Sequence, residues 1–324
     1  MKFEEQVTKI KQMISDAQTI AVVGHYNPDG DCIGCCAAVA EALESQGKDV
    51  SIFVDGEISD KFSYIRKLKE FNLHADKEHF DLLIVLDLND PSRLGVWGDL
   101  LTKSNKVIVL DHHRNPLFNQ CDLLIDMPEY ASTGEIVYRI FEILKVKITL
   151  EIATALYTSI ACDTGCFLFS NTTAYTHHVV ESLMQQHKID IETINFRNFR
   201  AYNRNNIPLI SYILKNMKFA FDGKLSIAVL PFKIVKKWNL NYESRHGLFK
   251  YATDVNGTIS SIFLTELKKG EFNVSLRSLG NIDVAKIAQA IGGGGHRNAS
   301  GATYKGSLKQ LLKVLLAEFA RVIA

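Results

Sequence analysis

Carboxylate and imidazole side chains recur in short clusters through the first half of the chain. The first cluster, GHYNPDGD at positions 24–31, contains His25, Asp29 and Asp31 within seven residues. These are residue types that bind divalent metal ions. For this cluster taken alone, ordinary turn and helix N-cap roles explain the two aspartates better.

Three later clusters favour the metal-binding interpretation. Asp87 follows the apolar run LLIVL, Asp111 with His112 and His113 follows VIVL, and Asp163 lies in ACDTG after a helical apolar pattern. A carboxylate at the end of a buried strand needs a hydrogen bond or a cation, because burying it unpaired is costly. Taken one at a time, each of these aspartates could be an ordinary turn residue. Adjacent histidines on an extended chain point to opposite sides, so the pair implies a local departure or two different roles.

Together these clusters predict a two-metal phosphoesterase. They supply four carboxylates and at least two imidazoles, a set suited to Mn²⁺ and other oxygen-preferring ions. Unpaired carboxylates would repel one another, whereas two divalent cations bring the set close to neutral. Metal pairs about 3.5 to 4 Å apart activate a bound water and hold the oxygens of a phosphoryl group.

The elements that must position these residues read as an α/β domain. From residue 19, short apolar runs such as TIAVV, DVSIF, LLIVL and KVIVL alternate with helical patterns, one of them over about 32–46. Such near-continuous apolar strands are typical of a parallel sheet with helices on both faces. In open α/β sheets functional groups gather beyond the carboxyl ends of the strands, so we expect one shared site.

The second half predicts a smaller α+β domain. Residues 132–214 read as mostly helical, with Ser132 and Thr133 as an N-cap, and the polar stretch within 186–208 could connect two lobes. Strand-like segments, a helix, a glycine run and an amphipathic helix follow. We therefore expect a catalytic domain at 1–185, a linker at 186–208 and a second domain at 209–324.

Composition points to an ordinary globular protein acting on small anions. Of the 324 residues 23% are charged and 47% are apolar, and the net charge of +1 gives no general attraction for long nucleic acid. No apolar run approaches the roughly 20 residues of a membrane span. We expect a cytoplasmic protein without a membrane partner, with its six cysteines reduced.

The cysteines offer a weaker alternative chemistry. Cys32 and Cys35 form a C-x-x-C, which could bind zinc or act in redox reactions. Their helical spacing among small apolar residues, with Cys36, favours buried packing. Cys162 and Cys166 receive the same interpretation.

A glycine run in the second domain could bind a phosphate. Glycines at 292–295 followed by His296 can present successive backbone N–H groups as an anion-binding nest. Arg277 could contact phosphate in a bidentate manner. A flexible loop and a surface salt bridge are the ordinary alternatives.

GHYNPDGD, LDLND, LDHH and ACDTG, in this order, resemble the four motifs of the DHH phosphoesterase family, and GGGGHRNASG resembles its associated C-terminal domain. The resemblance implies two ions, usually Mn²⁺, one held by His25, Asp29 and Asp87, the other by Asp31, Asp87, His112 and Asp163. It also implies that Asp111 orients the histidine pair and that His113 contacts the phosphate or the leaving oxygen. The chain departs from the family's common Gly-Ser with Gly34-Cys35-Cys36.

Within the family, the two-domain pattern resembles the branch that degrades short RNA and dephosphorylates 3′-phosphoadenosine 5′-phosphate. That resemblance implies nucleoside 5′-monophosphates and AMP as products, with the substrate's other phosphate held by Arg277, Gly293, Gly294, Gly295 and His296. A phosphodiesterase of linear or cyclic signalling dinucleotides and a noncatalytic nucleotide-binding regulator are the alternatives. A homodimer remains open.

Overall fold

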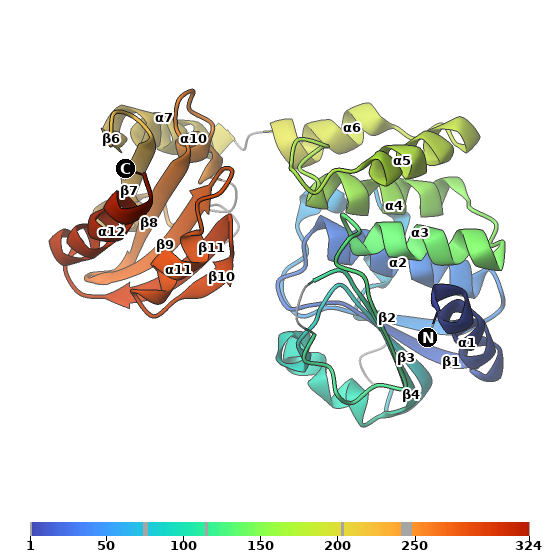
Figure 1. Cartoon of the computed structure of the whole chain (residues 1–324). Helices are drawn as coiled ribbons and strands as arrows, with labels where there is room; N and C mark the ends of the chain where they lie inside the picture. The colour runs from blue at the N-terminus through green and yellow to red at the C-terminus, as the bar shows by residue number, and fades with distance from the viewer. Residues whose placement is uncertain (1, 74–76, 114–115, 202–203, 241–247, 324) are drawn as a thin grey trace. The chain divides into compact units, whose positions relative to one another are not determined.

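The apolar segments of the first half form a five-stranded parallel sheet in the computed structural model of the chain (Figure 1). The strand order is β2-β1-β3-β4-β5, so β1, β3 and β4 are neighbours. The strands are β1 Thr19–Val23, β2 Asp49–Phe53, β3 Phe80–Leu86, β4 Ser104–Asp111 and β5 Leu123–Asp126. The predicted parallel α/β sheet is confirmed.

The structure describes residues 2–73, 77–113, 116–201, 204–240 and 248–323, apart from the side chains of Asn205 and His296. The chain divides into two units, Met1–Ala201 and Tyr202–Ala324. This boundary falls inside the segment 186–208 that the sequence predicts as a linker. The part of that segment before the boundary contains helix α6 and the π-helix η4, which belong to the first unit.

Helices α1, α2 and α3 cover one face of the parallel sheet, and α4 and α5 form a further layer over them (Figure 1). The opposite face is covered by η3, a 3-10 segment whose Leu94 and Leu100 pack on Val85 and Val109. The elements of this unit beyond the sheet are α1 Phe3–Asp16, α2 Gly30–Glu44, η1 Asp60–Phe62, η2 Arg66–Glu70, η3 Pro91–Leu101, α3 Thr133–Leu144, α4 Leu150–Asp163, α5 Ala174–Gln186, α6 Ile191–Asn195 and η4 Phe196–Arg200.

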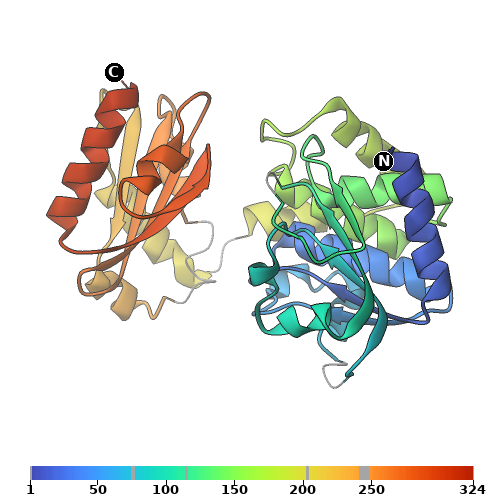
Figure 2. The ribbon, with the colours of Figure 1, turned by 60° about the horizontal axis from the view of Figure 1, so that its bottom comes forward.

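The second unit is a six-stranded mixed sheet with order β10-β11-β9-β8-β7-β6, which confirms the predicted α+β class. Helices α11 and α12 pack on one face and α7, α8 and α10 on the other (Figure 2). Its elements are η5 Arg204–Asn206, α7 Ile207–Asn216, β6 Lys218–Ala220, β7 Leu225–Leu230, α8 Phe232–Lys237, α10 Lys250–Thr253, β8 Ser260–Lys268, β9 Glu271–Ser278, α11 Val284–Gln289, β10 Gly294–His296, β11 Ala299–Lys305 and α12 Leu308–Ile323. Across the described residues, no helix is both long and apolar enough to cross a bilayer.

Close packing of α2 against α4 depends on a glycine. A Cβ atom at Gly34 would lie 2.5 Å from the carbonyl oxygen of Ala155 and 2.8 Å from the Cβ of Ser159. Both are nearer than real Cβ contacts allow, and one obstacle is backbone. The two helices can therefore approach this closely only because position 34 has no side chain.

We expect Gly34→Ala to lower the free energy of unfolding by about 1–3 kcal/mol, because α2 and α4 must separate to admit the methyl group. Urea denaturation measures this. Gly98→Ala is the matched control, since a Cβ there meets nothing within 4 Å, and it should stay within about 0.5 kcal/mol of wild type. Equal stability of the two variants would contradict the packing argument.

Candidate metal centre

Three neighbouring strands deliver the first functional side chains to one edge of the sheet. His25 lies two residues beyond the end of β1, Asp87 follows β3 directly, and Asp111 ends β4. Because these strands are parallel and adjacent, their carboxyl ends meet at the same edge. The site predicted at this edge from the sequence is therefore assembled by the sheet itself.

The N-terminus of α2 adds two carboxylates. Asp29 is the N-cap, and its Oδ1 accepts hydrogen bonds from the N–H groups of Asp31 and Cys32 at 3.0 and 3.2 Å. The same oxygen lies 3.6 Å from Nε2 of His25. Asp29 thus has the N-cap role of the ordinary interpretation and also stands beside a candidate metal ligand. Asp31 is buried in the first turn.

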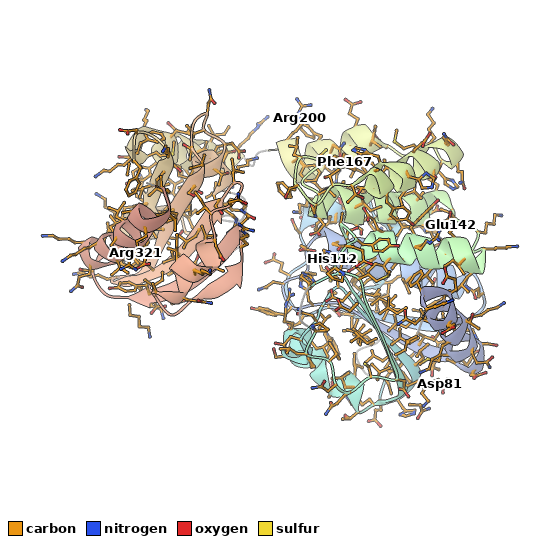
Figure 3. The ribbon with its side chains drawn as sticks, viewed as in Figure 1. Asp81, His112, Glu142, Phe167, Arg200 and Arg321 are labelled. Carbon is orange, nitrogen blue, oxygen red and sulfur yellow. The ribbon has the colours of Figure 1, made fainter. Side chains whose placement is uncertain are left out.

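Among the described residues, three groups of histidines and aspartates could each hold a metal ion. Within each group the candidate ligand atoms lie within 4.8 Å of one another. The groups are His25 with Asp29 and Asp87, Asp31 with His112 and Asp163, and Asp87 with His112 and His113. All six ligands expected from the sequence occur in these groups, and His112 is labelled in Figure 3.

Asp87 lies between the groups. Its Oδ2 is 3.5 Å from Nε2 of His25, whereas its Oδ1 is 3.6 Å from Nε2 of His112 and 3.8 Å from Nδ1 of His113. Its backbone has a positive φ of 63°, a conformation that is uncommon outside glycine and costs free energy. The two carboxylate oxygens therefore face different histidines, which is the arrangement a bridging ligand needs.

The two histidines that follow β4, His112 and His113, both lie near Oδ1 of Asp87. The strand ends at Asp111, and the rings of His112 and His113 lie 4.6 Å apart at an angle of 51°. Adjacent histidines on a regular strand would point to opposite sides, so the chain departs from strand geometry here, as the sequence predicted. Asp111 is buried and accepts a hydrogen bond of 2.7 Å from Nδ1 of His113. Burial lowers the pKa of His113, but this hydrogen bond and the nearby carboxylates raise it above its ordinary value.

His112 has the properties of a neutral metal ligand. Burial lowers the pKa of its imidazole, which therefore stays uncharged at neutral pH. Its ring hydrogen-bonds the backbone of Tyr130, while its buried Nε2 has no hydrogen-bond partner among the described residues. That nitrogen lies 3.3 Å from Asp163 and 3.6 Å from Asp31. A buried, unpartnered imidazole nitrogen among carboxylates fits a metal ion.

The carboxylates of the site disfavour one another's negative charge. Burial and the negative charge of Asp87 raise the pKa values of both Asp31 and Asp163 well above the ordinary range. Asp163 is also the last residue of α4, where the helix dipole is negative and disfavours an anion. A divalent cation would relieve both effects.

Family comparisons agree with this geometry. The chain matches the family model described as DHH family, N-terminal domain, over residues 19–160, and the DHHA1 domain over residues 246–324. The bifunctional oligoribonuclease and PAP phosphatase NrnA of Thermus thermophilus is 34% identical over 89% of this chain and 84% of its own. The chain belongs to the DHH family.

Two further proteins are similar to this DHH protein, and the match covers different shares of their own length. The cyclic-di-AMP phosphodiesterase GdpP of Geobacillus thermodenitrificans is 26% identical over 89% of this chain, which spans 45% of GdpP. The crystal structure of an exopolyphosphatase-related protein from Bacteroides fragilis is 25% identical, with a TM-score of 0.90 over 99% of this chain and 98% of that one. The solved structure therefore matches this chain over both of its domains.

Sequence reasoning missed the groups that hold the carboxylates of the DHH site. Asp31 accepts hydrogen bonds from the N–H groups of Thr133 and Gly134 at 2.8 and 3.2 Å and from the hydroxyl of Ser159. Thr133 also donates its hydroxyl to Oδ1 of Asp87 at 3.2 Å. One signal was available, because Ser159 precedes Asp163 by four residues and so lies on the same face of α4.

In the DHHA1 domain, Arg277 on β9 contacts an aromatic ring and a backbone carbonyl oxygen. Its guanidinium lies 4.5 Å from the ring centre of Phe249 and donates to the carbonyl oxygen of Leu276 at 2.9 Å. Among the described residues no carboxylate oxygen lies within 4.0 Å of it, so the salt bridge considered from the sequence is not seen. Its remaining donors can serve an anion.

The glycine run is more regular than the predicted nest. The N–H of Gly293 donates to the carbonyl oxygen of Ala288 at 2.8 Å, so Gly293 does not offer it to an anion as the nest required. Gly294, Gly295 and His296 form β10 and pair with β11. A Cβ at Gly293 or Gly295 would collide with β11, whereas one at Gly294 meets nothing within 4 Å. The side chain of His296 lies outside the described part of the chain.

The cysteines of α2 lie apart from this chemistry. Cys32, Cys35 and Cys36 are fully buried and free, and burial raises the pKa of each thiol well above its ordinary value. Among the described residues none of them belongs to a candidate metal group. The sulfur atoms of Cys32 and Cys36 pack against Gly24, where an added Cβ would lie 2.2 and 3.2 Å from them.

Repulsion among the carboxylates predicts how this protein responds to metal. Saturating Mn²⁺ should raise the melting temperature of wild type, since each ion at 100 times its Kd contributes about 2.7 kcal/mol. Asp163→Asn removes a repelling charge, so the metal-free variant should melt at the same or a higher temperature, while at least about half of the Mn²⁺ shift is lost.

Differential scanning calorimetry with and without Mn²⁺ measures both effects. Glu192→Gln, which neutralises an exposed acid on α6, is the control and should keep the full shift. A metal-free Asp163→Asn protein that melts well below wild type would show that this carboxylate stabilises the fold by itself.

Proposed function

We propose that this protein is a cytoplasmic, Mn²⁺-dependent phosphoesterase that hydrolyses short oligoribonucleotides to nucleoside 5′-monophosphates and 3′-phosphoadenosine 5′-phosphate to AMP. The observation that carries the proposal is the position of Asp87, whose two oxygens face two different groups of possible metal ligands. The similarity to NrnA over most of both chains supports this pair of substrates.

The ligand sets follow from the observed groups. His25, Asp29 and Asp87 would hold one ion, and Asp31, Asp87, His112 and Asp163 the other, with Asp87 shared. When bound, two divalent ions supply an activated water and positive charge at the phosphoryl oxygens. The four carboxylates of the set balance the four positive charges of two such ions, so the loaded site is close to neutral.

Asp111 and His113 would act on the substrate rather than on the ions. The buried Asp111 carboxylate fixes the orientation of the His113 ring through Nδ1. We assign to Nε2 of this ring the contact with the phosphate or with the leaving oxygen. The raised pKa of His113 favours its protonated form, which can stabilise negative charge or donate a proton there.

Both proposed substrates present the same bond. In each, hydrolysis between phosphorus and a 3′ oxygen leaves a nucleoside 5′-monophosphate. We assign the substrate's other phosphate to the DHHA1 domain, where Arg277 has donors without an acidic partner among the described residues. We assign the same phosphate also to Gly294, Gly295 and His296, since a small ligand can approach Gly294 without steric hindrance.

A phosphodiesterase of signalling dinucleotides is the second candidate, because the cyclic-di-AMP phosphodiesterase GdpP matches most of this chain. The chain spans less than half of GdpP, and NrnA is the more similar relative in identity. The first candidate is therefore preferred. Hydrolysis of a cyclic dinucleotide in preference to a diribonucleotide would reverse the order.

Asp87→Asn should lower kcat/KM at least about 10³-fold on every substrate, because the shared ligand loses a charge needed by both ions. The assay compares a diribonucleotide, 3′-phosphoadenosine 5′-phosphate, a cyclic dinucleotide and pyrophosphate with Mn²⁺. Glu192→Gln should retain wild-type rates. Absence of turnover by Mn²⁺-loaded wild type on all four would instead favour a noncatalytic nucleotide-binding regulator.

Arg277→Ala should raise KM for the diribonucleotide about 10- to 100-fold, the effect of losing a charge-assisted hydrogen bond to phosphate. Bis(p-nitrophenyl) phosphate has no second phosphate, so its hydrolysis should change little. Arg321→Ala removes an exposed arginine from α12 of the same domain and is the control. If Arg277→Ala impaired both substrates equally, the assigned role would be wrong.

A further inference from the structure

The segment that follows Asp163 has an unusual backbone. Gly165, Cys166 and Phe167 have φ values of 57°, 58° and 67°, so three consecutive residues are left-handed and two of them are not glycine. Left-handed backbone costs roughly 1–2 kcal/mol for each residue that has a Cβ. Such a conformation persists only where surrounding contacts impose it.

Those contacts are hydrogen bonds from every part of the segment. The N–H of Cys166 donates to the carbonyl oxygen of Ala161 at 2.7 Å, and the N–H of Phe169 donates to that of Thr164 at 3.0 Å. The hydroxyl of Thr164 accepts from the N–H of Phe167 at 3.2 Å. The N–H of Thr172 closes the turn on the carbonyl oxygen of Phe169 at 3.1 Å. These hydrogen bonds hold the segment in a defined conformation.

Of the three large apolar side chains in this turn, Phe167 is packed against other rings, whereas Leu168 and Phe169 are exposed. Phe167, labelled in Figure 3, packs against Tyr157 and His177 with ring centres 6.2 and 5.6 Å away. Leu168 and Phe169 are 84% and 59% exposed. Two adjacent large apolar side chains therefore lie in water on this turn, where burial against a ligand would be favourable.

The position of the Phe169 ring is fixed by a glycine. A Cβ at Gly165 would lie 2.5 to 2.7 Å from Cζ, Cε1 and Cε2 of this ring, so the end of the ring rests on the bare backbone. The ring therefore has little freedom to lose when a ligand binds. Preorganisation of this kind strengthens binding by lowering its entropic cost.

The turn is tied to the metal centre at both ends. It begins at Asp163, a candidate ligand, and the side-chain amide of Asn171 donates to the carbonyl oxygens of Asp163 and Ala131 at 3.1 Å each. Ala131 lies immediately before the N-terminus of α3, whose N–H groups hold Asp31. The Phe169 ring rests on Gly165, two residues after the candidate ligand Asp163.

We propose that Phe169, flanked by Leu168, is a nucleobase-binding surface that stacks on the base of the nucleotide whose phosphate lies at the metal centre. This inference rests on the proposed function and adds to it a contact for the base. Base stacking on an aromatic side chain tolerates any base, because every base presents a π face. The surface would therefore strengthen binding of nucleotides without selecting among the four bases.

Calorimetric binding of adenosine 5′-monophosphate and of ribose 5-phosphate to the Mn²⁺-loaded protein tests this. Wild type should bind the nucleotide more tightly than the sugar phosphate. Phe169→Ala should weaken nucleotide binding about 5- to 100-fold, as expected for loss of one stacked base, and leave ribose 5-phosphate binding unchanged. Phe169→Trp should restore the preference for the nucleotide.

Leu150→Ala is the control, since Leu150 is 45% exposed at the opposite end of α4. It should bind both ligands as wild type does. Equal affinity of wild type for the two ligands, or a Phe169→Ala protein that binds the nucleotide within twofold of wild type, would overturn the inference. So would equal weakening of both ligands. Failure to hydrolyse any nucleotide would refute the proposed function, whereas the binding comparison would still decide the stacking surface.

Discussion

Mutual repulsion of buried carboxylates is the constraint around which the N-terminal domain is organised. Asp31, Asp87 and Asp163 converge within a small volume, and burial together with the charge of Asp87 raises the pKa values of the other two. A fold that gathers negative charge in this way is less stable without cations than its core would otherwise allow. Affinity for metal ions and instability without them would therefore have the same origin.

The domain offsets part of this repulsion with oriented donors. The N-terminus of α3 directs two N–H groups at Asp31, and α2 begins with the capped Asp29, so two helix dipoles favour negative charge at the site. The hydroxyl of Thr133 supports Asp87. Hydrogen bonds of this kind fix the orientation of carboxylates that bind metal ions.

Sequence patterns predicted which acids and histidines lie close together, because their positions follow from the topology of the sheet. Acids after apolar runs had to meet once the strands were parallel, as Asp87 and Asp111 do. The supporting hydroxyl of Ser159 was missed because it depends on how α2 packs on α4. The sequence did not reveal that the N–H of Gly293 donates to the carbonyl oxygen of Ala288, because a glycine run fits either a nest or a hydrogen-bonded turn and only the fold distinguishes them.

The missing side chain at Gly34 also has a consequence for ion choice. Gly34 lies three residues after Asp31 on α2 and touches Ser159, which lies four residues before Asp163 on α4. The distance between these two carboxylates is therefore set by how closely the helices approach, one turn away from the ligands. Since ions differ in radius and preferred ligand distance, a helix contact outside the proposed coordination sphere would favour one ion size over another.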